Sequence, residues 1–239
     1  MSLYPIVVLP GLAGSRSEFD ALAAHLTGAR RVEIVLPFLD GDLTVDGQAR
    51  QFTARIAAAG IDKCVLIGHS HGGLVALSLA AQRPDLVAGL VLLDTPVQLP
   101  PVVRLAARVL FAAVPDRLFQ RGIRRFFAAT FTDADPRAWQ AAVMERLAGT
   151  PQAVIRAVVA GTFTYDSGTK LRALTVPALC VRANIPIRLD ELPATVRGEQ
   201  VLGVGHWPHV HSPETVNKIL DAFLQTLPAK PLPIGRTPR

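Results

Sequence analysis

The sequence predicts an α/β protein built on a twisted parallel sheet of about six strands with flanking helices. Apolar runs recur along the 239 residues, and a polar, helix-prone stretch follows nearly every one of them. The apolar runs are continuous rather than alternating, as expected of strands that are buried on both faces. Half of the residues are apolar, which is enough for a sizeable core.

Six apolar runs are the expected strands of this sheet. They cover residues 5–10, 32–37, 64–68, 89–94, 178–182 and 199–204. Between and after them, helices are expected at residues 17–26, 46–59, 71–82 and 213–227. The last of these has start signals, with Ser212 as N-cap, Pro213 at the first helical position and Glu214 near the positive end of the helix dipole.

One interval breaks the strand–helix rhythm, because about seventy residues separate Asp94 from the strand near Pro177. We expect residues 96–165 to form a helical cap and residues 1–95 and 166–227 to form the core. Within "DRLFQRGIRRFFAATF", helical spacing puts arginines on one face and large apolar side chains on another: Arg117, Arg121 and Arg124, against Phe119, Ile123, Phe126 and Phe127. This face either packs against the core or roofs a pocket. The Pro-rich end, residues 228–239, is expected to be a flexible basic tail.

The net charge of +6 is concentrated in two segments. Nine arginines against four acidic residues give the interval 96–165 a charge of +5, and the tail adds +3. The remainder is slightly acidic and contains no nucleic-acid-binding module. We therefore expect a small-molecule substrate and no nucleic-acid partner. A solvated arginine-rich face is the simpler interpretation of the charge, with an anionic substrate or surface as the alternative.

Targeting signals and reactive cysteines are not evident. The start "MSLYPIVVLPGLAGS" has no basic segment and its apolar run is short for secretion, and Arg or Pro interrupts every longer apolar stretch. These features predict a cytoplasmic protein without a membrane span. Cys64 and Cys180 lie in apolar segments, where a free thiol usually serves as a small core residue.

The stretch "LIGHSHGGLVALSLA" contains the pattern Gly68-x-Ser70-x-Gly72. An apolar strand precedes it and an apolar helix follows it, which is the context of a strained turn that exposes a nucleophilic serine. The small neighbours suit such a turn. The alternative, a metal site that begins His69-x-His71, lacks the Asp and the further His that would normally follow within a few residues.

A serine hydroxyl needs a base, and His206 is the candidate. It is the first histidine after the last expected strand, so its loop should open at the same edge of the sheet as Ser70. Gly203 and Gly205 are expected to keep that loop close to the sheet. His209 and His211 are alternative zinc ligands together with His69 and His71, but no carboxylate or thiolate completes that set, so no metal and no cofactor are expected.

Acyl transfer also needs donors for the developing oxyanion. The first strand ends in Pro10-Gly11-Leu12, which would let the Leu12 amide face the serine. The His71 amide, at the start of the following helix, would be the second donor. Alternatively, Gly11 and Gly14 simply form a turn into the next helix.

With its elbow "GHSHGG", its early "LPGLAGS", its late "GHWPHVHSPE" and its long insertion, the chain resembles the α/β-hydrolase fold family over almost its whole length. The resemblance implies six parallel strands without the leading antiparallel hairpin of that family. Because the nucleophile is a serine rather than an aspartate, it also implies hydrolysis of an ester or related acyl compound rather than dehalogenation or epoxide opening.

The triad acid departs from the usual family pattern. Most members carry it after the strand corresponding to 178–182, where this chain has Ala183-Asn184-Ile185-Pro186. Some members carry it one strand earlier, which here indicates Asp94. Asp190, Glu191 or a water held by Asn184 are the alternatives.

These features predict a serine hydrolase that cleaves a small, largely apolar carboxylic ester, thioester or lactone through an acyl-enzyme. The residues expected to act are Ser70, His206 and Asp94, with the Leu12 and His71 amides as the oxyanion hole. Two alternatives stay open. The His-Ser-His elbow with such an Asp also resembles cofactor-free oxygenases that open quinolone rings, and the pocket could belong to a non-catalytic binding protein.

Overall fold

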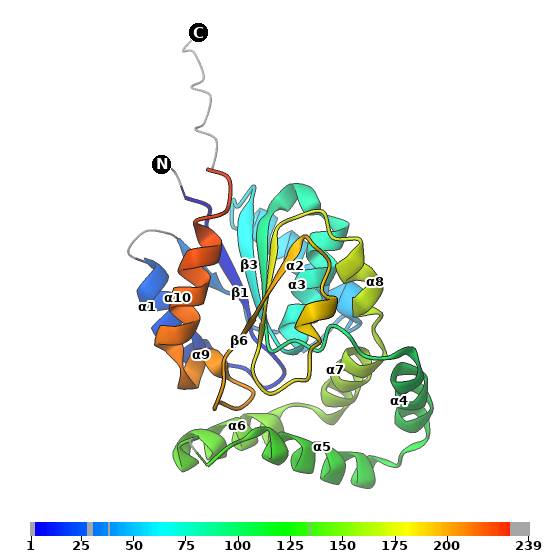
Figure 1. Cartoon of the computed structure of the whole chain (residues 1–239). Helices are drawn as coiled ribbons and strands as arrows, with labels where there is room; N and C mark the ends of the chain where they lie inside the picture. The colour runs from blue at the N-terminus through cyan, green and yellow to red at the C-terminus, as the bar shows by residue number, and fades with distance from the viewer. Residues whose placement is uncertain (1–2, 28–30, 38, 134, 230–239) are drawn as a thin grey trace.

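The computed structural model describes residues 3–27, 31–37, 39–133 and 135–229. Six parallel strands form one sheet in the order β2-β1-β3-β4-β5-β6 (Figure 1). Their bounds are β1 Ile6–Leu9, β2 Val32–Ile34, β3 Cys64–His69, β4 Val87–Leu93, β5 Ala178–Arg182 and β6 Val196–Gln200. The predicted fold class is therefore confirmed, and the four central strands are buried almost throughout, as their continuous apolar runs require.

Helices cover both faces of the sheet. Around α1 and α10, one apolar cluster packs on the first face, and around α2, α3 and α8 a second cluster packs on the other. The bounds are α1 Asp20–Thr27, α2 Val45–Ala58, α3 His71–Gln82, α8 Ser167–Arg172, α9 Pro208–His211 and α10 Pro213–Leu224, with short 3-10 helices η1 Arg16–Phe19, η2 Pro84–Leu86 and η3 Leu189–Glu191. The helices predicted at 46–59, 71–82 and 213–227 are close to α2, α3 and α10, and the one at 17–26 is divided between η1 and α1.

The carboxyl ends of β3 and β4 lie side by side. Gly68 pairs with Leu92, and the amide of Ser70 donates a 3.0 Å hydrogen bond to the carbonyl of Leu93. The residues that follow the two strands, Ser70 and Asp94, therefore flank the same point of the sheet edge.

One local prediction needs correction, and another, Ser212 as the N-cap of α10, is confirmed in position only. The last strand is Val196–Gln200 rather than 199–204, because as an edge strand it is only half-buried and pairs with β5 through its polar segment. Beyond it, Leu202 is exposed and Gly203 has a φ of +74°, so the chain has already left the sheet. Ser212 does precede α10, but its hydroxyl bonds to the Thr215 hydroxyl at 2.8 Å rather than to a backbone amide.

Between β4 and β5 the chain forms four further helices. They are α4 Pro101–Ala113, α5 Asp116–Thr130, α6 Arg137–Gly149 and α7 Gln152–Thr164, and each starts directly after a proline. In Figure 1 they lie together below the sheet, at the end of the molecule opposite the two termini. Their apolar residues form a third cluster that includes Trp207 from the loop after β6. The division into core and cap stays a prediction that this arrangement agrees with.

Two expectations concern the ends and the membrane. The predicted flexible tail lies outside the described residues from 230 onward. Among the described helices, none is long and apolar enough to cross a membrane. The cytoplasmic location stays a prediction.

Candidate active site

Ser70 occupies a strained turn between β3 and α3. Its φ of +52° lies in the left-handed region that residues with a side chain rarely adopt. The turn needs glycines on both sides. A Cβ at Gly68 would lie 2.5 Å from the Gly73 Cα, and one at Gly72 would lie 2.2 Å from the Leu9 carbonyl oxygen. The pattern Gly-x-Ser-x-Gly is thus explained by packing of the backbone.

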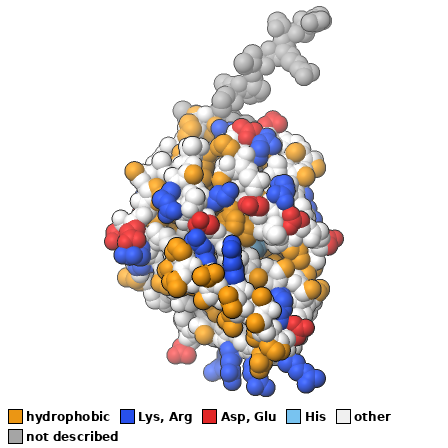
Figure 2. All heavy atoms as spheres, turned by 90° about the vertical axis from the view of Figure 1, so that its right-hand side faces the viewer, with side chains coloured by type: hydrophobic (Ala, Val, Ile, Leu, Met, Phe, Trp, Pro, Cys, Tyr) orange, Lys and Arg blue, Asp and Glu red, His pale blue; other side chains and the backbone are white. Residues whose placement is uncertain are grey.

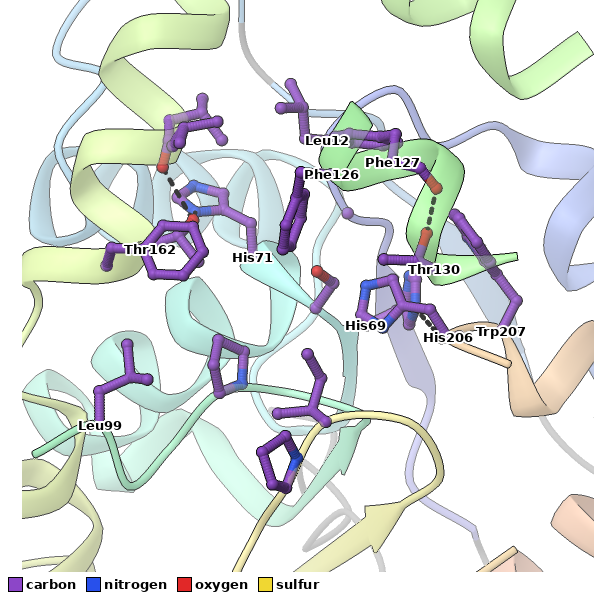
Figure 3. Close-up of a pocket in the computed structure, with 18 of the residues that line it drawn as sticks. Leu12, His69, His71, Leu99, Phe126, Phe127, Thr130, Thr162, His206 and Trp207 are labelled. Carbon is purple, nitrogen blue, oxygen red and sulfur yellow. Dashed lines mark hydrogen bonds between the residues drawn. The ribbon is translucent and has the colours of Figure 1, made fainter. Parts of the chain in front are cut away.

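A cavity of about 280 Å³ opens above this turn (Figure 3). Ser70 and His206 line it, together with residues from the first strand's turn, from α5 and α7, and from the loops after β4, β5 and β6. The lining consists of Gly11, Leu12, His69, Ser70, His71, Pro96, Gln98, Leu99, Phe126, Phe127, Thr130, Val158, Val159, Thr162, Phe163, Ile185, Pro186, His206 and Trp207. This set, taken from the described chain, contains no Lys, Arg, Asp or Glu, so the walls suit an uncharged, apolar group.

Asp94 and His206 form a buried pair beside the cavity. The Asp94 Oδ2 lies 2.7 Å from the His206 Nδ1, and the side chain of Asp94 is fully buried. The pairing leaves the His206 Nε2 as the ring nitrogen remote from the acid. Between this Nε2 and the Ser70 Oγ, both on described residues, the structure forms no hydrogen bond. In enzymes without a bound substrate such contacts are often long and tighten only in the complex.

The loop after β5 binds the carboxylate of Asp94 through its backbone amides. The amides of Ala183 and Ile185 donate to the Asp94 Oδ1 at 2.8 and 3.0 Å. This is the loop in which the family usually carries its acid. The alternatives considered from the sequence, Asn184, Asp190 and Glu191, are all exposed to solvent.

The loop that carries His206 is fixed on two sides. The His69 Nε2 donates to the His206 carbonyl at 2.8 Å, and the His206 amide donates to the Thr130 carbonyl of α5 at 3.3 Å. A Cβ at Gly205 would lie 2.8 Å from that same Thr130 carbonyl oxygen, whereas one at Gly203 would meet nothing within 4 Å. Only Gly205 therefore serves a close approach, and it faces α5 rather than the sheet.

The Leu12 amide belongs to the turn after β1, and the His71 amide directly follows Ser70 in the chain. A Cβ at Gly11 would lie 3.1 Å from the Ser70 Cβ, so the turn after β1 rests directly on the elbow. His71 is the first residue of α3, where an amide has no acceptor inside the helix. Within the described residues, neither the Leu12 nor the His71 amide has a hydrogen-bond acceptor. Both donors are therefore available, and the helix dipole at the start of α3 favours a negative charge near the His71 amide.

The ring of His71 has a separate, structural place. The Gln48 Nε2 lies 3.0 Å from its Nε2, and the Thr162 hydroxyl lies 2.8 Å from its Nδ1. Because Gln48 donates, the ring carries its proton on Nδ1 and donates to Thr162. Burial lowers the pKa of His71 to about 4, so the ring is neutral at pH 7. It links the start of α3 to α2 and to α7.

The structure does not bring together the four histidines that were considered as zinc ligands. The His71 ring faces Gln48 and Thr162, while His211 pairs with the buried Asp135 at 2.8 Å. However, the expectation that no carboxylate accompanies these histidines was wrong for His69 and His209. Glu18 lies with His69 and His209 in a buried group whose ligand atoms are within 4.8 Å of one another.

This buried group already holds a cation. The Arg146 Nη2 binds the Glu18 Oε1 at 2.5 Å. Burial raises the pKa of Glu18 to about 7, although Arg146 acts to lower it. Burial also lowers the pKa of His209 to about 3, which keeps that ring neutral. A guanidinium next to a single carboxyl opposes a second cation, so the fit to a metal is poor.

Comparisons with known proteins identify the family of the chain. The model of the alpha/beta hydrolase family matches residues 6–219. An sn-1-specific diacylglycerol lipase, ABHD11 of Danio rerio, is 40% identical over 99 residues, which is 38% of this chain and 31% of that protein. The match thus spans about a third of that relative's length. The esterase YbfF of Escherichia coli K12 is 26% identical over 92% of both chains.

Solved structures show the same fold over nearly the whole chain. The enol-lactonase of Burkholderia xenovorans LB400 has a TM-score of 0.76 at 18% identity and covers 93% of this chain and 92% of its own. The quinolone-signal ring-cleaving protein AqDC also has a TM-score of 0.76, at 21% identity and 92% coverage of both chains. At these identities the likeness concerns the fold alone.

Proposed function

The chain belongs to the alpha/beta hydrolase family, and we propose that it is a serine hydrolase that cleaves a small, largely apolar ester, thioester or lactone. The observation that carries the proposal is the buried 2.7 Å pair of Asp94 and His206, whose imidazole shares a cavity with Ser70. A nucleophile, a base and an acid that orients the base are the parts that acyl transfer requires.

The proposed reaction begins with attack by the Ser70 Oγ on the substrate carbonyl carbon. The His206 Nε2 takes the hydroxyl proton, and the Leu12 and His71 amides bind the oxyanion. Collapse of the tetrahedral intermediate releases the leaving group, which receives the proton from His206, and leaves an ester on Ser70. Water, deprotonated by His206, then attacks this ester. His206 then passes the proton from this water to the Ser70 Oγ as its bond to the acyl carbon breaks, and the carboxylic acid product leaves.

The position of Asp94 supports its proposed role. Its Oδ2 accepts from the His206 Nδ1, which keeps the Nε2 lone pair available for the serine proton. The developing imidazolium is stabilised by the carboxylate, and the Ala183 and Ile185 amides keep that carboxylate in place without protonating it.

The cavity supports the proposed substrate class. Its volume of about 280 Å³ suits a small acyl group, and the lining is mostly aliphatic and aromatic. Ser70 and His206 line this cavity together with Phe126, Val159 and Phe163, so an apolar acyl chain bound at Ser70 would contact these apolar side chains.

A panel of 4-nitrophenyl esters of increasing acyl length tests the proposal. We expect an initial burst of nitrophenol equal to the enzyme concentration, followed by slower turnover, because an acyl-enzyme accumulates when water attacks it slowly. The measurement is stopped-flow absorbance at several enzyme concentrations. Release of nitrophenol without formation of a covalent acyl-protein, examined by mass spectrometry after acid quenching, would contradict the acyl-enzyme.

The proposed cap leads to a prediction about specificity. Phe126 and Phe127 of α5 line the cavity, so changing either to alanine is expected to alter kcat/KM for the longest esters on the order of tenfold relative to the acetate ester. Phe119→Ala is the matched control, since Phe119 is buried on the same helix but does not line the cavity. An equal loss on all esters would assign these rings to stability alone.

A further inference from the structure

Helix α4 (Pro101–Ala113) is an apolar helix that the rest of the protein hardly covers. Ala107 is its one buried residue. Val102, Leu105 and Val109 follow one another at helical spacing and form a single stripe along the helix. Leu105 is 63% exposed and Val109 is 65% exposed. An apolar stripe of this kind on a monomer marks a surface that contacts something else.

The apolar surface continues onto α5. Leu118 is 56% exposed and Phe126 is 42% exposed. Between the two helices lies a groove of about 230 Å³ whose walls include Leu110, Leu118 and Phe126. Of the eleven exposed large apolar side chains in the described residues, seven belong to α4 and α5. They are therefore concentrated on one face rather than scattered.

Arginines surround this face without partners. Arg108, Arg117, Arg121, Arg124 and Arg125 are exposed, and in the described parts of the chain none of the five forms an ion pair. In Figure 2, which views the molecule from the side of α4, apolar side chains cover much of the lower half and basic side chains line the lower edge. Apolar side chains flanked by unpaired cations are the composition of helices that lie in a membrane interface.

We propose that the face formed by α4 and α5, defined by Val102, Leu105, Val109, Leu118 and the arginines of α5, docks onto an anionic lipid surface. The apolar stripe would enter the boundary between headgroups and acyl chains, and the guanidinium groups would bind lipid phosphates. The docked face leads toward the site, because Phe126, Val159 and Phe163 line both the outer groove and the cavity above Ser70.

The charge favours lipid over a second copy of the chain. Residues 96–165 contain nine arginines and four acidic residues, so two such faces would bring together like charges. An anionic bilayer offers the complementary sign at the same place as an apolar layer. The docking goes beyond the proposed function and is measured without turnover, so failure of one does not imply failure of the other.

The experiment is co-sedimentation of the protein with vesicles of phosphatidylcholine alone and of phosphatidylcholine mixed in equal amounts with phosphatidylglycerol. We expect binding to the mixed vesicles and much weaker binding to the neutral ones. Leu105→Ser/Val109→Ser should lower the affinity on the order of 100-fold, because burial of each side chain contributes about tenfold. The matched control is Leu39→Ser/Leu202→Ser, which changes two exposed apolar residues elsewhere and should bind like the wild type.

A second pair of variants separates a specific face from net charge. Arg117→Gln/Arg121→Gln/Arg124→Gln should lower binding to the mixed vesicles on the order of 100-fold, since each basic group near an anionic surface contributes about fivefold. Arg50→Gln/Arg83→Gln/Arg197→Gln removes the same charge from ion pairs outside this face and should have little effect. Equal losses in the two triple variants, or no wild-type binding to the mixed vesicles, would overturn the proposal. So would a concentration-dependent dimer that Leu105→Ser/Val109→Ser abolishes.

Discussion

Ser70→Ala is expected to lower ester turnover on the order of 10⁴-fold or more, because alanine removes the nucleophile and nothing else. The backbone already carries the strain of a φ of +52° with serine, and alanine has the same Cβ, so the elbow should keep its shape. Steady-state kinetics with a 4-nitrophenyl ester measures the loss. A fluorophosphonate probe should label the wild type at Ser70 and leave Ser70→Ala unlabelled.

Ser78→Ala is the matched control for this variant. Ser78 is a buried serine of α3, the helix that follows Ser70, and its hydroxyl donates to Asp46 at 2.6 Å, away from the cavity. Its loss should cost stability but not turnover per folded molecule. If Ser70→Ala retains activity, or if the folded wild type resists the probe, the acyl-enzyme is wrong and a reaction that uses only the pair of His206 and Asp94, as in a cofactor-free oxygenase, becomes the better explanation.

Asp94→Asn is expected to lower turnover on the order of 10⁴-fold, the effect of neutralising the acid of a serine triad. The contacts of Asp94 dictate how the amide would sit. Its Oδ1 accepts from the Ala183 and Ile185 amides, so the asparagine oxygen must take that place and its NH₂ group must face the His206 Nδ1. The imidazole would then carry its proton on Nε2, where it cannot accept the serine proton.

The fold should tolerate this change. Asp94 has a φ of +43°, and asparagine is among the side chains that accept that region most readily. Thermal unfolding monitored by circular dichroism verifies folding beside the kinetics. The controls Asp190→Asn and Glu191→Gln concern exposed carboxyls and should leave turnover within a few-fold of the wild type. A large loss in either control with normal activity of Asp94→Asn would move the acid to η3.

The elements that the sequence predicts at the correct residues depend on local contacts. The elbow at Ser70 is one, because Gly68 and Gly72 are required by backbone atoms a few residues away or on the adjacent strand. Helix α3, predicted at 71–82, begins and ends at those residues because a strained turn precedes it and Pro84 follows shortly after. The central strands were equally predictable, since burial on both faces requires unbroken apolar runs. The edge strand β6 was predicted at the wrong residues, because a half-buried strand has no such run.

The sequence predicts Asp94 and His206 as site residues because of their order along the chain and the topology of the sheet. Both follow strands of one parallel sheet, so their side chains had to emerge at one edge even though 112 residues separate them. Topology does not predict the hydrogen bond between them, because Asp190 or Glu191 could reach the same edge and bind His206 instead. The hydrogen bonds from Ala183 and Ile185 to Asp94 could not be predicted from the sequence, because backbone amides donate them and any residue type has such an amide.

By itself the sequence determined the order of the strands along the chain, the strained serine and the chemistry of the side chains at the sheet edge, because neighbours in sequence or fixed periodicities govern each of these. Tertiary structure alone decided which partner each buried polar group found. Glu18 meets His69, His209 and Arg146 from four separate segments. It also decided that the apolar stripe of α4 stays uncovered, because helical periodicity marks an apolar face but not what that face contacts.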